Sequence, residues 1–351
     1  MLARAFVSLA VITGAPASAG LKIVASIQAP NVDVPSAGAS DAFQVTLGSG
    51  SIQGFAITGL WTAPVADQSD GIAPWSLDFG VTVTAPDGST ATTPSPWFGD
   101  FTIADYPIAD GFAGFGAGAS PDGAWSIEFD SGNGAPWVAG LRNVTYHLLE
   151  ETGSDVTTTY TGNTQQGNSW SRPFFIEGVS GLGPVDYHVL EFTVTESGVY
   201  AFESVLLSGG EHWSCLYIDS FDDTQPLVNL HDYGLGNGFS PFNTPRGTSS
   251  FDQVLFEGTT YYWVTSQWSS FASFSDFTNT IVGPGEIVGP SDPCNAADLA
   301  PPSGFLDLSD VNAFITAFLA GDPSADIAFP FGFIDLSDVD AFIADFLAGC
   351  P

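Results

Sequence analysis

Basic residues are scarce in this sequence. Lysine and arginine together number 5 in 351 residues, against 39 aspartates and glutamates, and the formal net charge is −34. A chain with this charge repels polyanions, so nucleic acid and anionic lipid surfaces are not expected partners. The acidity fits a solvated surface in salty water, and it also supplies the oxygen ligands that divalent cations prefer.

Long apolar segments are missing after the first residues. The start, "MLARAFVSLAVITGAPASAG", places Arg4 before an apolar run to Ile12 and ends in small residues, which predicts a secretory signal over residues 1–19. No later segment has the roughly 18 consecutive apolar residues of a membrane-spanning helix. We therefore expect no membrane span and a protein that is secreted, extracellular or associated with the cell surface.

Residues for nucleophilic or metal-assisted catalysis are few. The chain has four histidines and no G-x-S-x-G motif. His212 and Cys215 are three residues apart in "EHWSC", and on a strand they would face opposite sides, so they are not expected to share a zinc ion. With 39 acidic residues, a carboxylate pair for glycoside hydrolysis cannot be identified from spacing alone. The sequence therefore predicts no catalytic residue.

Glycine, proline and short β-favouring runs are plentiful. Residues 20–150 alternate apolar and polar positions between Pro-Asp-Gly turns at 86–88 and 121–123, which is typical of half-buried antiparallel strands. The positions expected to face the core are Phe79, Val81, Val83, Trp125, Ile127, Phe129, Val144, Tyr146 and Leu148. With "APDGS" and "PDGAWSIEF" between these strands, residues 75–149 resemble the P-domain, which implies a jelly-roll-like β-sandwich.

A second β domain is predicted over residues 169–285. Residues 151–168 are polar and threonine-rich, and we expect either a linker or an edge strand there. The segments "FTVTESGVY", "LYIDSFD", "LFEGTTYYWV" and "IVGPG" resemble the bacterial pre-peptidase C-terminal domain, which implies another jelly-roll-like sandwich used as an accessory module. A Pro- and Gly-containing linker is expected over 286–293.

The end of the chain, 294–351, contains a duplication. "GFLDLSDVNAFITAFLAG" at 304–321 returns 28 residues later as "GFIDLSDVDAFIADFLAG" at 332–349. An EF-hand loop has Gly at position 6, an apolar residue at 8, a ligand at 9 and an acid at 12. The matching residues are Gly304, Leu306, Asp307 and Asp310 in the first copy, and Gly332, Ile334, Asp335 and Asp338 in the second.

Each loop is followed by an amphipathic segment. In the first copy five apolar residues recur at helical spacing, and the second copy repeats them. They are Val311, Phe314, Ile315, Phe318 and Leu319, then Val339, Phe342, Ile343, Phe346 and Leu347. Because helices of this length are marginal alone, we expect the two to share one core. Cys294 and Cys350 bracket the unit, which predicts a disulfide between them in an oxidising compartment and leaves Cys215 as a buried thiol.

The loop pattern, the single helix after each loop and the "AGCP" ending resemble a type I dockerin, in the variant that ends secreted planctomycete proteins. The resemblance implies an EF-hand pair that binds calcium and docks to a cohesin-like or other cell-surface protein. The family's partner-recognition residues, at loop positions 10 and 11, correspond to Leu308 and Ser309 in the first copy and to Leu336 and Ser337 in the second. The calcium ligands that it implies are Asp298, Asp307, Asp310, Asp326, Asp335 and Asp338.

The loops depart from that family pattern at the other ligand positions. Asp298 and Asp326 stand one residue early, as if each loop held an insertion, and Phe331 stands where an oxygen ligand is needed. Backbone carbonyls and water would then have to complete the coordination, so we expect weak calcium binding. An alternative interpretation is that Asp310 and Asp338 cap the two helices.

We therefore expect a mostly β protein, with two jelly-roll-like sandwiches before a small helical dockerin-like unit. The favoured function is that of a secreted non-catalytic binding or structural protein, attached to its partner by the C-terminal unit. The alternative is an extracellular polysaccharide-active hydrolase or carbohydrate-binding component. Nine tryptophans, among them Trp97, Trp137 and Trp268 in surface-like loops, could stack on sugar rings.

Overall fold

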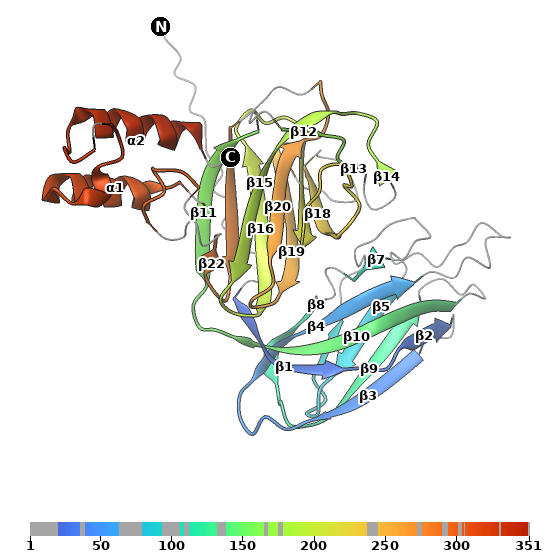
Figure 1. Cartoon of the computed structure of the whole chain (residues 1–351). Helices are drawn as coiled ribbons and strands as arrows, with labels where there is room; N and C mark the ends of the chain where they lie inside the picture. The colour runs from blue at the N-terminus through green and yellow to red at the C-terminus, as the bar shows by residue number, and fades with distance from the viewer. Residues whose placement is uncertain are drawn as a thin grey trace, which may run out of the picture.

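A computed structural model describes most of the chain after the predicted signal. The described residues are 20–35, 39–62, 79–92, 106–108, 112–131, 138–164, 168–174, 178–236, 245–271, 276–289, 294–300, 304, 306–329 and 331–349. This part of the chain is mostly β, with 22 strands and two α-helices, both near the C-terminus (Figure 1).

The first β-sandwich is formed by residues 21–151. One sheet contains β1 (Leu21–Gln28), β2 (Val32–Pro35), β4 (Ile52–Thr62), β7 (Tyr106–Pro107), β8 (Phe112–Ala119) and β10 (Val138–Glu151). The facing sheet has the order β3 (Ala39–Val45), β9 (Gly123–Ser131), β5 (Phe79–Thr84), β6 (Thr90–Thr92). All the pairings are antiparallel, as the hairpin-rich sequence indicates.

Alternation in the sequence identifies the core of this sandwich correctly. Eight of the nine predicted inward positions are buried: Val81, Val83, Trp125, Ile127, Phe129, Val144, Tyr146 and Leu148. The side chain of Phe79, the ninth, lies outside the described part. Trp125 stacks on Phe43 with ring centroids 6.1 Å apart, and its Nε1 donates to the Pro121 carbonyl at 3.1 Å.

The second β-sandwich is formed by strands between residues 156 and 288. One layer has β11 (Val156–Asn163), β21 (Asp276–Gly283), β16 (Gly198–Leu206) and β19 (Thr248–Leu255). The other has β12 (Ser169–Trp170), β15 (Val185–Val194), β20 (Tyr261–Gln267), β17 (His212–Ile218) and β18 (Leu230–Gly236), with β22 (Ile287–Val288) on β15. A small hairpin joins β13 (Pro173–Phe174) to β14 (Gly178–Val179).

Two segments that the sequence placed between domains take part in this sandwich. The stretch 151–168 contains β11, which pairs with β21 along its whole length and forms one edge of its layer. The expected linker 286–293 begins with β22, whose two residues pair with Thr193 and Val194. For 151–168 the edge-strand alternative is therefore the one that the structure has. The strand in 286–293 was not predicted, because two paired residues leave no repeating pattern.

A continuous sheet joins the two sandwiches. Strand β1 pairs with β10 of the first sandwich and, at Lys22, with Gly198 at the start of β16. A Cβ atom on Gly198 would lie 2.2 Å from the Leu21 carbonyl oxygen, so glycine is required for this approach. A small apolar cluster seals the junction: Leu21, Ala56, Leu149, Val199 and Val254.

The helical unit lies beside the second sandwich, next to the edge strand β11 (Figure 1). It contains α1 (Leu308–Ala320), the short 3₁₀ turn η2 (Pro323–Ala325) and α2 (Leu336–Ala348). At 13 residues each, both α-helices are shorter than a bilayer crossing requires, and none of the described helices could span a membrane.

Replacing Phe202 with alanine tests the core of the second sandwich. Phe202 is buried, stacks on Phe251 at 4.8 Å and meets Trp263 edge-on at 5.0 Å. We expect Phe202→Ala to lower the free energy of unfolding by about 3–5 kcal/mol, measured by urea unfolding with tryptophan fluorescence. The matched control is Phe271→Ala, because Phe271 is 90% exposed; its effect should stay within about 0.5 kcal/mol. Equal effects of the two variants would contradict this core.

Candidate docking site

Both α-helices of the C-terminal unit begin with the same capping arrangement. Asp307 is the N-cap of α1 and accepts from the Ser309 N–H at 2.6 Å, while Asp310 accepts from the Asp307 N–H at 2.8 Å. Asp335 and Asp338 repeat this capping box at the start of α2. The N-cap is therefore the acid at loop position 9, and the acid at position 12 supplies the reciprocal hydrogen bond.

The two helices share a small aromatic core. Phe314 and Phe342 stack with ring centroids 4.2 Å apart and ring planes 14° apart. Ala297 and Ala325 are fully buried beside them, at equivalent positions of the two copies. Partly buried apolar residues surround this centre: Leu299, Leu306, Val311, Ala317, Phe318, Ile327, Ile334, Val339 and Phe346. The prediction of a shared core is confirmed for Val311, Phe314 and Phe318 and their counterparts.

Part of the predicted core face is open to solvent. Ile315 and Leu319 were expected inside, but they are 49% and 80% exposed, and their counterparts Ile343 and Leu347 are 49% and 79% exposed. The reason is geometric: the shared core is centred on the Phe314–Phe342 pair, and it covers only a narrow stripe on each helix. The remaining apolar side chains therefore form a second stripe beside the core.

The recognition leucines implied by the sequence lie on that second stripe. Leu308 and Leu336 are each 76% exposed at the first position of their helices. We call the six residues Leu308, Ile315, Leu319, Leu336, Ile343 and Leu347 the twin stripes. Ser309 and Ser337 are held differently, because the hydroxyl of each donates to the N-cap carboxylate two residues earlier. The leucines are thus free for contact, whereas the serine hydroxyls stabilise the helix start.

The second loop adds aromatic surface that the first loop matches in sequence at one of three positions. Phe329, Phe331 and Phe333 are all exposed, and the rings of the first two meet edge-on at 6.3 Å. The equivalent sequence positions of the first copy are Pro301, Ser303 and Phe305, which lie outside the described residues. Because its side chain is apolar, Phe331 cannot serve as an oxygen ligand.

The loop carboxylates are occupied by backbone N–H groups. Asp310 Oδ1 accepts from Leu299 and Ala300, both at 2.8 Å, and Asp338 Oδ1 accepts from Ile327 at 2.9 Å and Ala328 at 2.8 Å. Two further carboxylates hold the loop glycines.

In the first loop, Asp298 Oδ2 accepts from Gly304 at 2.5 Å and from Cys294 at 2.8 Å. In the second, Asp326 Oδ2 accepts from Gly332 at 2.5 Å. Both glycines have positive φ, +85° and +97°, as the sharp turn requires.

These donors leave a poor ligand set for calcium. Calcium takes about six to eight oxygen ligands, but both oxygens of Asp310 already accept N–H groups, and Leu299, at loop position 1, offers no side-chain oxygen. Asp298 Oδ1 and Asp326 Oδ1 are buried without a donor. Each loop therefore has one carboxylate oxygen, from Asp298 or Asp326, that accepts no hydrogen bond. Across the described residues no three His, Cys, Asp or Glu side chains converge to hold a metal. The described donor set therefore does not fit calcium.

The surroundings act on the two position-12 acids in opposite directions. Burial raises the pKa of the Asp310 carboxyl against the effect of its N–H donors, and the nearby Asp298 carboxylate adds to the rise. At Asp338 the N–H bonds from Asp335 and Ala328 prevail, and the pKa lies below its usual value.

The start of the unit is tied to its end. Asn295 Nδ2 donates to the Asp345 carbonyl at 3.0 Å and to the Gly349 carbonyl at 3.1 Å, at the C-terminal end of α2. Cys294 is disulfide-bonded, and Cys350, its predicted partner, lies outside the described residues. Cys215 is a free, buried thiol in the second sandwich. These ties close the unit around its small core.

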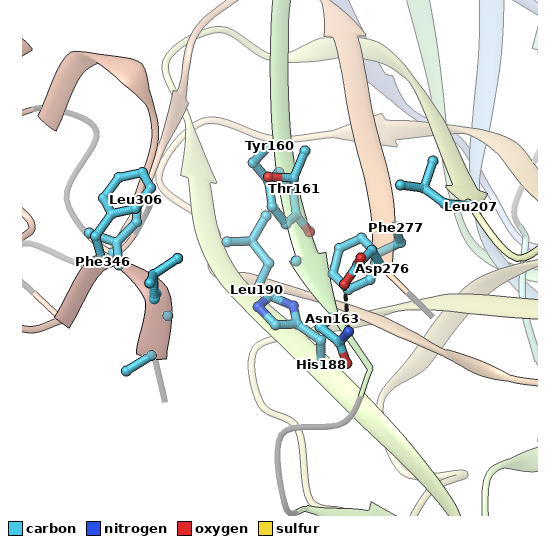
Figure 2. Close-up of a pocket in the computed structure, with 15 residues that line it drawn as sticks. Tyr160, Thr161, Asn163, His188, Leu190, Leu207, Asp276, Phe277, Leu306 and Phe346 are labelled. Atoms are coloured by element: carbon cyan, nitrogen blue, oxygen red, sulfur yellow. Dashed lines mark hydrogen bonds between the residues drawn. The ribbon is translucent and has the colours of Figure 1, made fainter. Parts of the chain in front are cut away.

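A cavity of about 430 Å³ separates the unit from the second sandwich (Figure 2). Leu306 and Phe346 of the helical unit face Tyr160 and Thr161 of β11 across it, and Asn163 Nδ2 donates to Asp276 Oδ1 at 2.5 Å on the sandwich side. Leu347 also lines this cavity, yet it keeps the same exposure as its counterpart Leu319. The sandwich therefore leaves the twin stripes uncovered.

The histidine and cysteine considered for metal binding do not meet. His212 is buried, with Nδ1 3.0 Å from the Ser266 carbonyl and Nε2 2.7 Å from the Ser204 hydroxyl. Cys215 belongs to the apolar cluster on the other side of β17, with Trp213 and Tyr217. Burial lowers the pKa of His212 to about 4, so the imidazole is neutral at pH 7, and the Ser266 carbonyl accepts from Nδ1–H.

A second cavity, of about 340 Å³, opens beside β12 on the second sandwich. Its walls are formed by Ser169, Trp170, Ser171, Val179, Pro184, Asp223, Thr224 and Pro226. Trp170 is 2% exposed, and its indole N–H has no acceptor in the described part of the chain. Asp223 Oδ2 accepts from the Tyr187 hydroxyl at 3.0 Å. Hydroxyls, a carboxylate and an aromatic ring thus meet in one hollow, which sequence spacing could not reveal.

Of the three tryptophans expected in surface loops, the structure describes only Trp268. Trp97 and Trp137 lie outside the described residues. Trp268 is half-buried, and the guanidinium carbon of Arg172 lies 3.7 Å from the centroid of its ring. One face of Trp268 is therefore engaged in a cation–π contact within the protein.

Comparison with known proteins identifies no family. No family model and no curated protein matches the chain. Among solved structures, the N-terminal CBM22 tandem of Paenibacillus barcinonensis Xyn10C aligns at 11% identity over 77% of this chain and 100% of that one, with a TM-score of 0.21. PNGase F, a glycosylasparaginase from Flavobacterium meningosepticum, aligns at 11% identity over 76% and 99%, with a TM-score of 0.22. Likenesses this distant carry no argument about function.

The neutral state of His212 leads to a prediction about pH. Its pKa is about 4 in the folded protein and about 6.5 in an unfolded chain. The unfolded state therefore binds more protons below pH 6.5, so stability is complete above that pH and falls as the pH drops toward 4. In His212→Gln, the slope of unfolding free energy between pH 6.5 and 5 should decrease by up to about 1.4 kcal/mol per pH unit. Urea unfolding at several pH values measures it; an unchanged slope would contradict a neutral buried imidazole.

Proposed function

We propose that this is a secreted, non-catalytic attachment protein that docks to an extracellular or cell-surface partner through its C-terminal unit. The observation that carries the proposal is the pair of twin stripes. Six large apolar side chains are exposed at equivalent positions of two helices, with nearly equal exposures in each pair. Exposed apolar surface of this kind is typical of interaction sites in monomeric proteins.

The partner that the sequence resemblance suggests is a cohesin-like protein. A type I dockerin-like unit would place Leu308 and Leu336 at the centre of contact, and both side chains are open to solvent. In this proposal the two sandwiches are jelly-roll-like accessory modules, and residues 1–19 direct the chain out of the cell. The duplicated unit has nine aspartates and no lysine, arginine or histidine, which favours a partner without an acidic face.

Serine substitutions on the twin stripes test the docking proposal. The full chain should capture a binding protein from the producing cell's envelope, and the captured protein is then purified and titrated. We expect Leu308→Ser with Leu336→Ser to weaken binding at least about tenfold, because burying one leucine contributes about 1.5–3 kcal/mol.

The matched control is Leu207→Ser with Val228→Ser, which removes exposed apolar residues from the second sandwich instead. The control should bind as the natural chain does. Equal losses in both double variants, or binding that persists after the twin-stripe change, would contradict a docking role for the helices.

A second candidate function, carbohydrate binding, is favoured by the cavity beside β12. The Asp223 carboxylate and the hydroxyls of Ser169 and Ser171 are groups that bind sugar hydroxyls. Because Asp223 adds negative charge to an acidic chain, a neutral polysaccharide fits this hollow better than an acidic one.

Affinity electrophoresis in gels that contain neutral polysaccharides tests this candidate. We expect at least one polysaccharide to retard the natural chain, and Asp223→Ala to weaken that retention about tenfold, because hydrogen bonds to charged groups contribute about 1.5–3 kcal/mol. Glu203→Ala, an exposed acid on β16, is the control. No retardation would remove the candidate, and release of reducing sugar would contradict a non-catalytic protein.

A further inference from the structure

We propose that the two loops of the C-terminal unit close without calcium, because backbone N–H groups take the place that a cation occupies in an EF-hand loop. The inference concerns how the unit folds, and it holds whether or not the unit docks to a partner. It rests on hydrogen bonds that recur in both copies.

The acid at the end of the loop is the centre of this arrangement. In an EF-hand the position-12 carboxylate gives both oxygens to the ion. Here Asp310 gives Oδ1 to two N–H groups, those of Leu299 and Ala300, and Oδ2 to a third, that of Asp307. Three N–H dipoles therefore converge on one carboxylate and supply the positive potential that holds the loop against its helix.

A second carboxylate holds the other side of the loop. Asp298 is 4% exposed, and its Oδ2 accepts from Gly304 and Cys294. Asp298 thus binds the glycine turn at 304, and Asp310 binds the backbone of residues 299 and 300. No bridging ion is needed to bring these segments together.

The second copy repeats these contacts with a different loop sequence. Asp338 accepts from Ile327, Ala328 and Asp335, and Asp326 accepts from Gly332. The intervening residues differ, with Phe329 and Phe331 exposed in this copy. Because the loop sequence changes while the hydrogen bonds persist, the hydrogen bonds are the common element of the two loops.

Among the residues that the structure describes, the remaining side-chain oxygens do not make up a calcium cage. Oδ1 of Asp307 accepts from both the N–H and the hydroxyl of Ser309, and Oδ1 of Asp335 accepts from the same two groups of Ser337. Asp298 Oδ1 and Asp326 Oδ1 are without a donor, and one such oxygen is a small part of the about six to eight that calcium takes. The positions where further side-chain ligands would stand include Leu299, at loop position 1, and Phe331, at loop position 5.

Hydrogen exchange of the full chain tests the proposal locally. The amides of Leu299, Ala300, Ile327 and Ala328 should exchange slowly in excess EGTA, and their rates should change less than about twofold when millimolar calcium replaces EGTA. Fast exchange in EGTA that slows tenfold or more on addition of calcium would overturn the proposal. No partner is present, so the result is independent of docking.

Substitutions of the position-12 aspartates test whether their carboxylates cause the slow amide exchange. Asp310→Ala should speed exchange at Leu299 and Ala300 about tenfold or more, because it removes the acceptor of both. Asp338→Ala should do the same at Ile327 and Ala328. The control Asp340→Ala removes an exposed acid of α2 and should leave these rates unchanged.

If Asp310→Ala prevents folding, Asp310→Asn keeps the shape and one acceptor oxygen, and an intermediate increase in exchange is expected in EGTA. Unchanged rates at Leu299 and Ala300 in either Asp310 variant would contradict the proposal.

Discussion

Hydrogen bonds from backbone N–H groups to aspartate oxygens hold the turns, the helix starts and the C-terminal loops of the described chain. Only two ion pairs occur among the described residues, Arg142 with Asp33 and Arg246 with Glu211, and the side chains of both pairs are partly exposed. With few cations available, the aspartates bind the main chain instead. Asp87 accepts from Ser89 in a hairpin turn, and Asp122 accepts from Leu47 and Gly48 across a loop.

The same interaction forms both helix starts and both loops at the C-terminus. Asp307 and Asp335 cap the helices, while Asp310 and Asp338 bind the loops to them. The unit has a small core, in which only Ala297, Phe314, Ala325 and Phe342 are buried among the described residues. Because so little apolar area is buried, local hydrogen bonds are needed to stabilise the unit. The helices therefore keep their places without burying every apolar side chain, and the twin stripes remain free for a partner.

The two sandwiches are joined to each other before the helical unit begins. Their layers meet in one sheet through β1, and the glycine at 198 permits the close approach of the chains. The helical unit lies at the edge strand β11, far along the chain from the first sandwich but next to the second (Figure 1). This arrangement leaves the helices at the side of the molecule, where a docked partner would meet little obstruction from the sheets.

Patterns of period two and of helical period predicted most of the secondary structure. Trp125, Ile127 and Phe129 alternate inward on β9 because one face of that strand is solvated. The duplicated segment predicted two helices but not the residues that begin them. The N-caps are Asp307 and Asp335, whereas Asp310 and Asp338, which were considered as caps, stand three residues later at N3. Edge strands such as β22 were not predicted, because their short pairing leaves no repeating pattern.

What the sequence determined by itself was therefore local: the strand faces, the turns, the two amphipathic helices and the duplication. Contacts between distant segments decided the rest. Ile315 and Leu319 follow the helical apolar pattern as well as Phe314 does, but only the crossing of α1 and α2 excludes them from the core. The cavity beside β12 likewise needs Ser169 and Asp223, which are brought together only by the folded sheet. A periodic pattern states which side of an element is apolar, whereas burial depends on what packs against it.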